Sequence, residues 1–166
     1  MYSTHEGYND SIHGYYLEDL EVGMSASHAK TVTETDVVMF AGLTGDNNPI
    51  HCNEVFAAQT RFKGRIAHGM YTGGLISAAI AMTLPGPGTI YLGQDLRFER
   101  PVRIGDTITV QLTVLEKSDE KKLVKLQTVA SNQNGKVVVS GTASVMAPSQ
   151  KLRIERPAAP KVSISR

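Results

Sequence analysis

The chain has 166 residues and a net charge of +1, with 41% hydrophobic and 20% charged residues, which is the composition of one globular domain. The near-zero charge, the absence of tryptophan and the presence of only four phenylalanines argue against a nucleic-acid-binding surface. The single cysteine, Cys52, excludes an intramolecular disulfide and a cysteine-based metal cluster. We find neither a signal peptide nor an apolar run of membrane-spanning length, so the sequence predicts a cytoplasmic protein.

The two ends of the chain differ from the rest. Residues 1–13 are polar and lack periodicity, which indicates a loose arm. Residues 148–166 combine three prolines with five basic residues, which indicates an irregular basic tail. We therefore expect one folded domain over residues 14–147.

The first half of this domain is predicted to be mainly helical, after an opening strand over residues 25–32. Thr33 has the position of a helix N-cap, with Asp36 three residues later. Gly45 is the expected end of that helix, because glycine accepts the left-handed conformation there.

A short polar segment follows at once, Asp46-Asn47-Asn48-Pro49-Ile50-His51. Proline fixes its own φ and biases the residue before it toward an extended conformation. We therefore expect a rigid bracket rather than a helix over residues 46–51. Asn53 is then the predicted cap of a second short helix, from Glu54 to about Thr60.

A third helix is predicted over residues 68–82, ending before Pro85. It is apolar on nearly all sides, so we expect it to be buried on nearly all sides. Two adjacent glycines, Gly73 and Gly74, each cost a helix about 1 kcal/mol relative to alanine. A close neighbour of the backbone would explain them.

The second half predicts strands, because apolar and polar residues alternate in four runs. The runs cover residues 90–99, 107–114, 123–130 and 136–146. The segment 132–135, Asn-Gln-Asn-Gly, has the chemistry of a hairpin turn. One buried helix and an antiparallel sheet predict an α+β fold in which the sheet wraps around the helix.

Asp46 and His51 are the main candidates for chemistry. A carboxylate and an imidazole together move protons near neutral pH. Taken alone, this string forms a turn more often than a catalytic pair. Its position between two capped helices favours the catalytic reading. So does Gly69 at the start of the buried helix, where a free backbone N–H could hold a carbonyl oxygen.

Weaker candidates stand beside this pair. His68 is interpreted as a capping or core histidine in preference to a catalytic one. Ser77 either bonds back within its helix or belongs to the site, and the sequence leaves both open. A nucleophilic Cys52 is disfavoured, because only His51 lies near enough to lower its pKa. The five scattered histidines give little support to a metal site.

Two motifs, about 20 residues apart, carry a resemblance to a known family. FAGLTGDNNPIH at 40–51 and RIAHGM at 65–70 resemble the MaoC-like hydratases, the (R)-specific enoyl-CoA hydratases of the hotdog fold. The segments 14–24, 91–94 and 100–106 are also similar to that family. In that family, the segment similar to residues 14–24 belongs to the opening strand region. The resemblance covers roughly residues 15–147.

The resemblance implies a hotdog fold, in which a curved antiparallel sheet wraps a long central helix and copies pair edge to edge. It implies that Asp46 and His51 are the catalytic pair and that Gly69 gives the oxyanion-hole amide. Ser77 and Asn48 would support the site. It also implies an acyl-CoA substrate, no metal or redox cofactor, and a homodimer, with a trimer of dimers left open. No nucleic acid or membrane partner is expected.

The activity implied is the reversible addition of water to trans-2-enoyl-CoA, with short chains such as crotonyl-CoA expected. Three alternatives remain open at this point. The first is an acyl-CoA thioesterase of the same fold. The second is an acyl-thioester-binding subunit without activity. The third is a hydratase of branched acyl-CoA, such as mesaconyl-CoA, or of acyl-carrier-protein thioesters.

Overall fold

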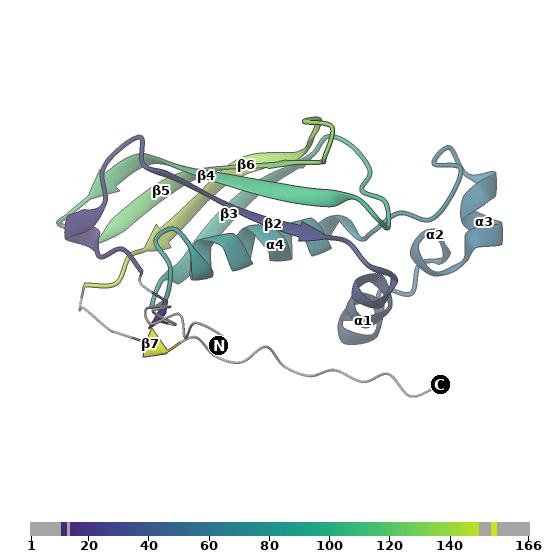
Figure 1. The fold of residues 1–166 in the computed structure, drawn as a ribbon, viewed down its shortest axis with the longest axis horizontal. Helices are drawn as coiled ribbons and strands as arrows, with labels where there is room; N and C mark the ends of the chain where they lie inside the picture. Colours follow the sequence, from purple (N-terminus) through teal and green to yellow (C-terminus); the bar gives the residue numbers. More distant parts are fainter. Residues whose placement is uncertain (1–10, 13, 150–153, 156–166) are drawn as a thin grey trace, which may run out of the picture.

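The structure is a computed structural model that describes residues 11–12, 14–149 and 154–155. Its main body is a five-stranded antiparallel sheet with the strand order β2-β4-β5-β6-β3. A long helix, α4 (Gly69–Met82), runs along one face of this curved sheet (Figure 1). The strands are β2 (Ser25–Thr31), β3 (Ile90–Phe98), β4 (Thr107–Ser118), β5 (Leu123–Ser131) and β6 (Val137–Met146). This is the α+β arrangement that the sequence predicts.

The core lies between α4 and the concave face of the sheet. Alternate residues of β4 are fully buried, among them Ile108, Val110 and Leu112. They belong to the same buried cluster as Ile76 and Ile80 of α4. The period of two in β4 therefore places its apolar side chains against the helix. The predicted turn joins β5 to β6. It is closed by backbone hydrogen bonds from Asn132 N to Lys136 O and from Gly135 N to Asn132 O.

Three shorter helices gather at one end of the sheet, beyond the N-terminus of α4 (Figure 1). They are α1 (Glu34–Thr44), α2 (Pro49–Cys52) and α3 (Glu54–Gln59). The predicted caps are confirmed. Thr33 forms a capping box with Asp36, Gly45 ends α1 at φ 78°, and the Asn53 side chain accepts from Phe56 N.

One expectation about the bracket is wrong. Residues 49–52 form a one-turn helix, α2, where the sequence predicted a bracket without a helix. Proline occupies its first position, where a missing N–H costs nothing and the fixed φ suits a helix. The Asn48 side chain accepts a hydrogen bond from Ile50 N at 3.2 Å and caps this turn. His51 therefore stands on a short capped helix.

The burial expected for the third helix is also corrected. In the single chain, α4 buries one side and leaves an exposed stripe along the other. The stripe consists of Met70, Gly74, Ser77 and Ala81, which are spaced at helical intervals along one face. The hydrophobic pattern predicts burial of the helix on nearly all sides, and in the single chain the sheet covers only one side.

The ends of the chain add small elements. Leu17–Asp19 form a 3-10 turn, η1, in the region that the family resemblance assigned to an opening strand. Ser11–Ile12 (β1) pairs with Ile154–Glu155 (β7), which the sequence did not predict. The remainder of the expected loose arm and basic tail, residues 1–10, 13, 150–153 and 156–166, lies outside the described residues. Within the described part, no helix is long and apolar enough to cross a membrane.

Candidate active site

Asp46 lies directly after α1, in the loop that leads to α2. Its Oδ1 accepts a hydrogen bond from Asn48 N at 3.3 Å, and its carbonyl oxygen lies 2.9 Å from His68 Nε2. A carbonyl can only accept, so His68 donates here. Asp46 is exposed. Hydrogen bonds from Asn48 in the same loop and from His68 at the start of α4 hold it in position.

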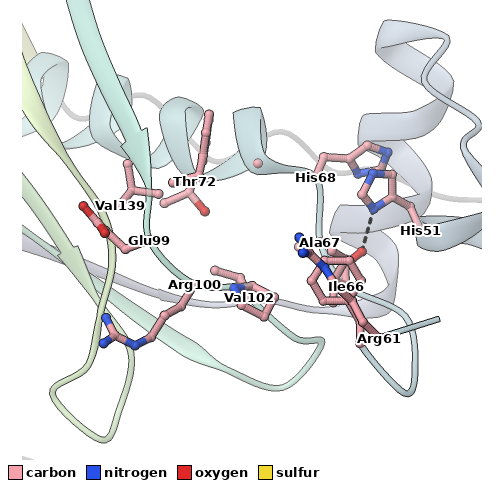
Figure 2. A pocket seen from close by; sticks show the side chains of 14 residues that line it. His51, Arg61, Ile66, Ala67, His68, Thr72, Glu99, Arg100, Val102 and Val139 are labelled. Carbon is pink, nitrogen blue, oxygen red and sulfur yellow. Dashed lines mark hydrogen bonds between the residues drawn. The ribbon is translucent and has the colours of Figure 1, made fainter. Parts of the chain in front are cut away.

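His51 is buried at 8% exposure, although it stands on a one-turn helix at the surface. Its Nδ1 lies 2.8 Å from the carbonyl oxygen of Ile66, a bond that is drawn in Figure 2. Because the carbonyl accepts, the proton on this bond belongs to Nδ1. The other ring nitrogen, Nε2, is then the one that can take up or release a proton.

His68 brings these two residues together. It is 2% exposed, and its ring centroid lies 3.9 Å from that of His51 and 4.9 Å from that of Phe40. This placement agrees with the interpretation of His68 as a core histidine at the start of α4. Its Nδ1 is buried and has no hydrogen-bond partner among the described residues.

The sequence-predicted pair converges. One ligand-type atom from each of Asp46, His51 and His68 lies within 4.8 Å of the other two. By distance alone these three residues could hold a cation. The five-residue spacing of the pair therefore brings the acid and the imidazole into direct reach, and the catalytic role of each remains a prediction.

A pocket of about 230 Å³ adjoins this cluster. His51, His68, Gly69, Phe98 and Val102 are among the residues that line it. Figure 2 shows Arg61 and Arg100 among the labelled residues around it. Asp46 does not line the pocket itself. Gly69 is the first residue of α4, so its N–H has no acceptor within the helix.

Phe98 explains the glycine at this position. A Cβ built on Gly69 would lie 2.9 Å from Phe98 Cε1, closer than real contacts allow. The ring and the helix start therefore lie in close contact, and both residues line the pocket. The helix N-terminus also carries a partial positive charge, which favours a negative oxygen in front of the Gly69 amide.

The two predicted supporting residues have different positions. Asn48 lies inside the site: it caps α2 and donates its N–H to Asp46. Ser77 is exposed, is absent from the pocket lining and follows Gly69 by eight residues on α4, about 12 Å along the axis. The single chain does not bring Ser77 to the pair, so its role stays a prediction.

The sequence did not predict a group of ion pairs that connects the helices around the site. Arg65 pairs with Glu34 through two hydrogen bonds of 2.7 Å each, and its Nε lies 3.2 Å from Glu54 Oε2. It thereby links the first turns of α1 and α3. Arg65 also directly precedes Ile66, whose carbonyl oxygen accepts the hydrogen bond from His51 Nδ1. The hydrogen bond from Arg65 lowers the pKa of the Glu34 carboxyl. No local signal reveals a pairing across 31 residues.

A carboxylate and an imidazole lie close together beside a pocket that the first residue of α4 helps to line, an arrangement that suits acid–base chemistry. Such a site suits the addition or removal of water beside an activated carbonyl.

Comparisons with known proteins agree with this kind of chemistry. The MaoC-like domain family matches residues 19–136. An (R)-specific enoyl-CoA hydratase of Rhodospirillum rubrum is 52% identical over 82% of this chain and 94% of its own length. A 3-hydroxybutyryl-CoA dehydratase of Methylorubrum extorquens is 48% identical over 82% of this chain and 86% of its own. The unliganded structure of R-hydratase PhaJ1 from Pseudomonas aeruginosa superposes with a TM-score of 0.88 at 50% identity, covering 93% of this chain and 99% of that one. The chain belongs to the MaoC-like dehydratase family, and its fold is the hotdog fold.

Proposed function

We propose that this protein is an (R)-specific enoyl-CoA hydratase, which adds water reversibly to trans-2-enoyl-CoA to give (R)-3-hydroxyacyl-CoA. The observation that carries the proposal is the convergence of Asp46 and His51 beside a pocket that Gly69, the first residue of α4, helps to line. The relatives named as an (R)-specific enoyl-CoA hydratase and a 3-hydroxybutyryl-CoA dehydratase support it.

The first step polarises the substrate. The thioester oxygen accepts a hydrogen bond from Gly69 N–H, and the partial positive charge of the α4 N-terminus favours negative charge on that oxygen. Electron density moves from the C2–C3 double bond toward the carbonyl, so C3 becomes electrophilic.

The second step adds water. A water molecule held between Asp46 and His51 gives a proton to the pair as its oxygen bonds to C3, and the double-bond electrons form an enolate. The pair then returns a proton to C2, so no net charge is gained or lost. The reverse sequence removes water from the 3-hydroxyacyl thioester.

This chemistry needs no metal or redox cofactor, because the chain supplies the base, the acid and the polarising donor. The relative named as a 3-hydroxybutyryl-CoA dehydratase favours a short acyl group, as in crotonyl-CoA.

We also propose that two copies of the chain pair along β3, one of the two edge strands of the sheet. An apolar edge strand left open invites such pairing. A trimer of such dimers is compatible with this interface. The exposed free thiol of Cys52 fits a reducing compartment, so we propose the cytoplasm as the location.

The test follows crotonyl-CoA by enoyl absorbance and by free thiol in the same cuvette, and identifies the product with an (R)-specific 3-hydroxyacyl-CoA dehydrogenase. We expect loss of enoyl absorbance, no thiol release and an (R) product. We expect Asp46→Asn and His51→Gln each to lower kcat by at least about 100-fold, with unchanged far-UV circular dichroism. Thiol release without hydration would identify a thioesterase, and near-full activity of either variant would refute the assigned pair.

A further inference from the structure

Thr72 is a polar residue in the pocket wall that the mechanism above does not use. It lies on α4, three residues after Gly69, and is only 1% exposed. Its hydroxyl oxygen is buried and has no hydrogen-bond partner among the described protein groups. A buried hydroxyl without a partner carries a free-energy cost. A functional contact would offset that cost when the pocket is filled.

Other threonines near helix ends in this chain behave differently. Thr44 Oγ1 donates to Phe40 O at 2.7 Å, and Thr83 Oγ1 donates to Ala79 O at 2.6 Å. Both follow the common i to i−4 pattern of helical threonine. Thr72 does not make this bond, so its hydroxyl, in the wall of the pocket, stays without a partner.

The direction of the side chain points to one part of the substrate. Helical side chains lean toward the N-terminus, and residues three apart share a face. Thr72 therefore covers the turn that starts at Gly69. Both residues line the same pocket, and Figure 2 shows Thr72 on the pocket side of α4.

We propose that the Thr72 hydroxyl is a second hydrogen-bond donor to the thioester oxygen, beside the Gly69 amide. The inference rests on the proposed hydratase function and adds a catalytic residue to it. As the enolate forms, negative charge gathers on that oxygen, and the hydroxyl bond strengthens while no covalent bond of Thr72 changes. A donor that acts in this way contributes mainly to kcat and little to KM.

Three variants test the donor. Thr72→Val keeps the shape and removes the hydroxyl, and we expect kcat for crotonyl-CoA to fall by about tenfold or more with little change in KM. Thr72→Ser keeps the hydroxyl and should retain most of kcat. Thr83→Val, at the C-cap of the same helix and outside the pocket lining, is the matched control and should leave kcat unchanged. Thr72→Ala replaces the valine variant if the latter does not fold. An unchanged kcat in Thr72→Val, a rise in KM alone, or equal losses in the valine and serine variants would overturn the proposal.

A second measurement avoids turnover. The Asp46→Asn variant, which we expect to be inactive, is mixed with 2,4-hexadienoyl-CoA, whose absorption band moves to longer wavelength when its carbonyl is polarised. We expect a smaller shift when Thr72→Val is added, and an equal shift would count against the donor. If wild-type protein does not hydrate crotonyl-CoA, the proposed function itself fails. If it does and Thr72→Val is fully active, only the present inference fails.

Discussion

Gly69 is the residue on which the site depends most closely, because it lines the pocket at the start of α4 and its missing side chain leaves room for Phe98. An added Cβ would lie 2.9 Å from Phe98 Cε1. Phe98 is 51% exposed, so its ring has space to move aside. The same Cβ would also occupy space next to the amide, where a thioester oxygen must arrive.

We therefore expect Gly69→Ala to lower kcat/KM by at least about tenfold, since a misplaced oxyanion donor is costly. The double variant Gly69→Ala/Phe98→Ala separates the two causes. If the clash with the ring were the whole effect, the double variant would regain the activity of Phe98→Ala alone. We expect it to stay impaired in steady-state kinetics, while thermal unfolding shows that the fold is kept.

The Asp46, His51 and His68 cluster has the spacing of a cation site, and the proposed chemistry does not use one. We expect exhaustive dialysis against EDTA to leave kcat unchanged, and added Zn²⁺ to inhibit by occupying the pair. A loss of activity on dialysis that Zn²⁺ or Mg²⁺ restores would contradict the metal-free mechanism. Metal content measured by inductively coupled plasma spectrometry before and after dialysis controls for carry-over.

At the scale of elements, Arg65 connects the helices that carry the site. It binds Glu34 on α1 in a bidentate pair and Glu54 on α3. A partly exposed pair of this geometry contributes about 0.5–1 kcal/mol. We expect Arg65→Met to lower the free energy of unfolding in urea by about this amount and to lower kcat, because Ile66, which holds His51, follows it directly. Full activity would show that Arg65 is not needed to position His51.

The same pair predicts a pH dependence. The hydrogen bond from Arg65 lowers the folded-state pKa of Glu34 below its ordinary value of 4.5. Its contribution to stability is therefore present above that value and is lost as the pH falls through the lower folded-state pKa. The stability difference between wild type and Glu34→Gln should thus be largest at neutral pH and shrink on acidification. Glu120→Gln, an exposed carboxylate with no hydrogen bond or ion pair among the described contacts, should show no such trend.

The elements that the sequence predicts well are those with local signals. Thr33, Gly45 and Asn53 cap helices through contacts within a few residues, and the strands follow from period-two patterns. Asp46 and His51 were found because only five positions separate them. The links that complete the site are distant in sequence: His68 reaches Asp46 across 22 residues and Arg65 reaches Glu34 across 31. No local pattern encodes such pairings, which packing alone decides.

At the scale of the whole molecule, the single chain leaves an apolar surface uncovered. The exposed stripe of α4 and the edge strand β3 carry large exposed side chains: Met70 at 57%, Ile90 at 55% and Leu92 at 51%. The helix pattern called for burial on nearly all sides, and the sheet covers only one. Contiguous apolar surface of this kind marks an interaction site, and an open strand edge is completed by another strand.

We therefore expect the wild-type protein to sediment as a dimer or a multiple of one, and Leu92→Glu to shift it toward the monomer. A glutamate on the open edge would place a like charge near its counterpart across the interface, where water is excluded. Val22→Glu is the control: Val22 is 67% exposed but precedes β2, the opposite edge of the sheet. It should leave the sedimentation coefficient unchanged. A wild-type monomer at micromolar concentration, or equal effects of the two substitutions, would rule out pairing along β3.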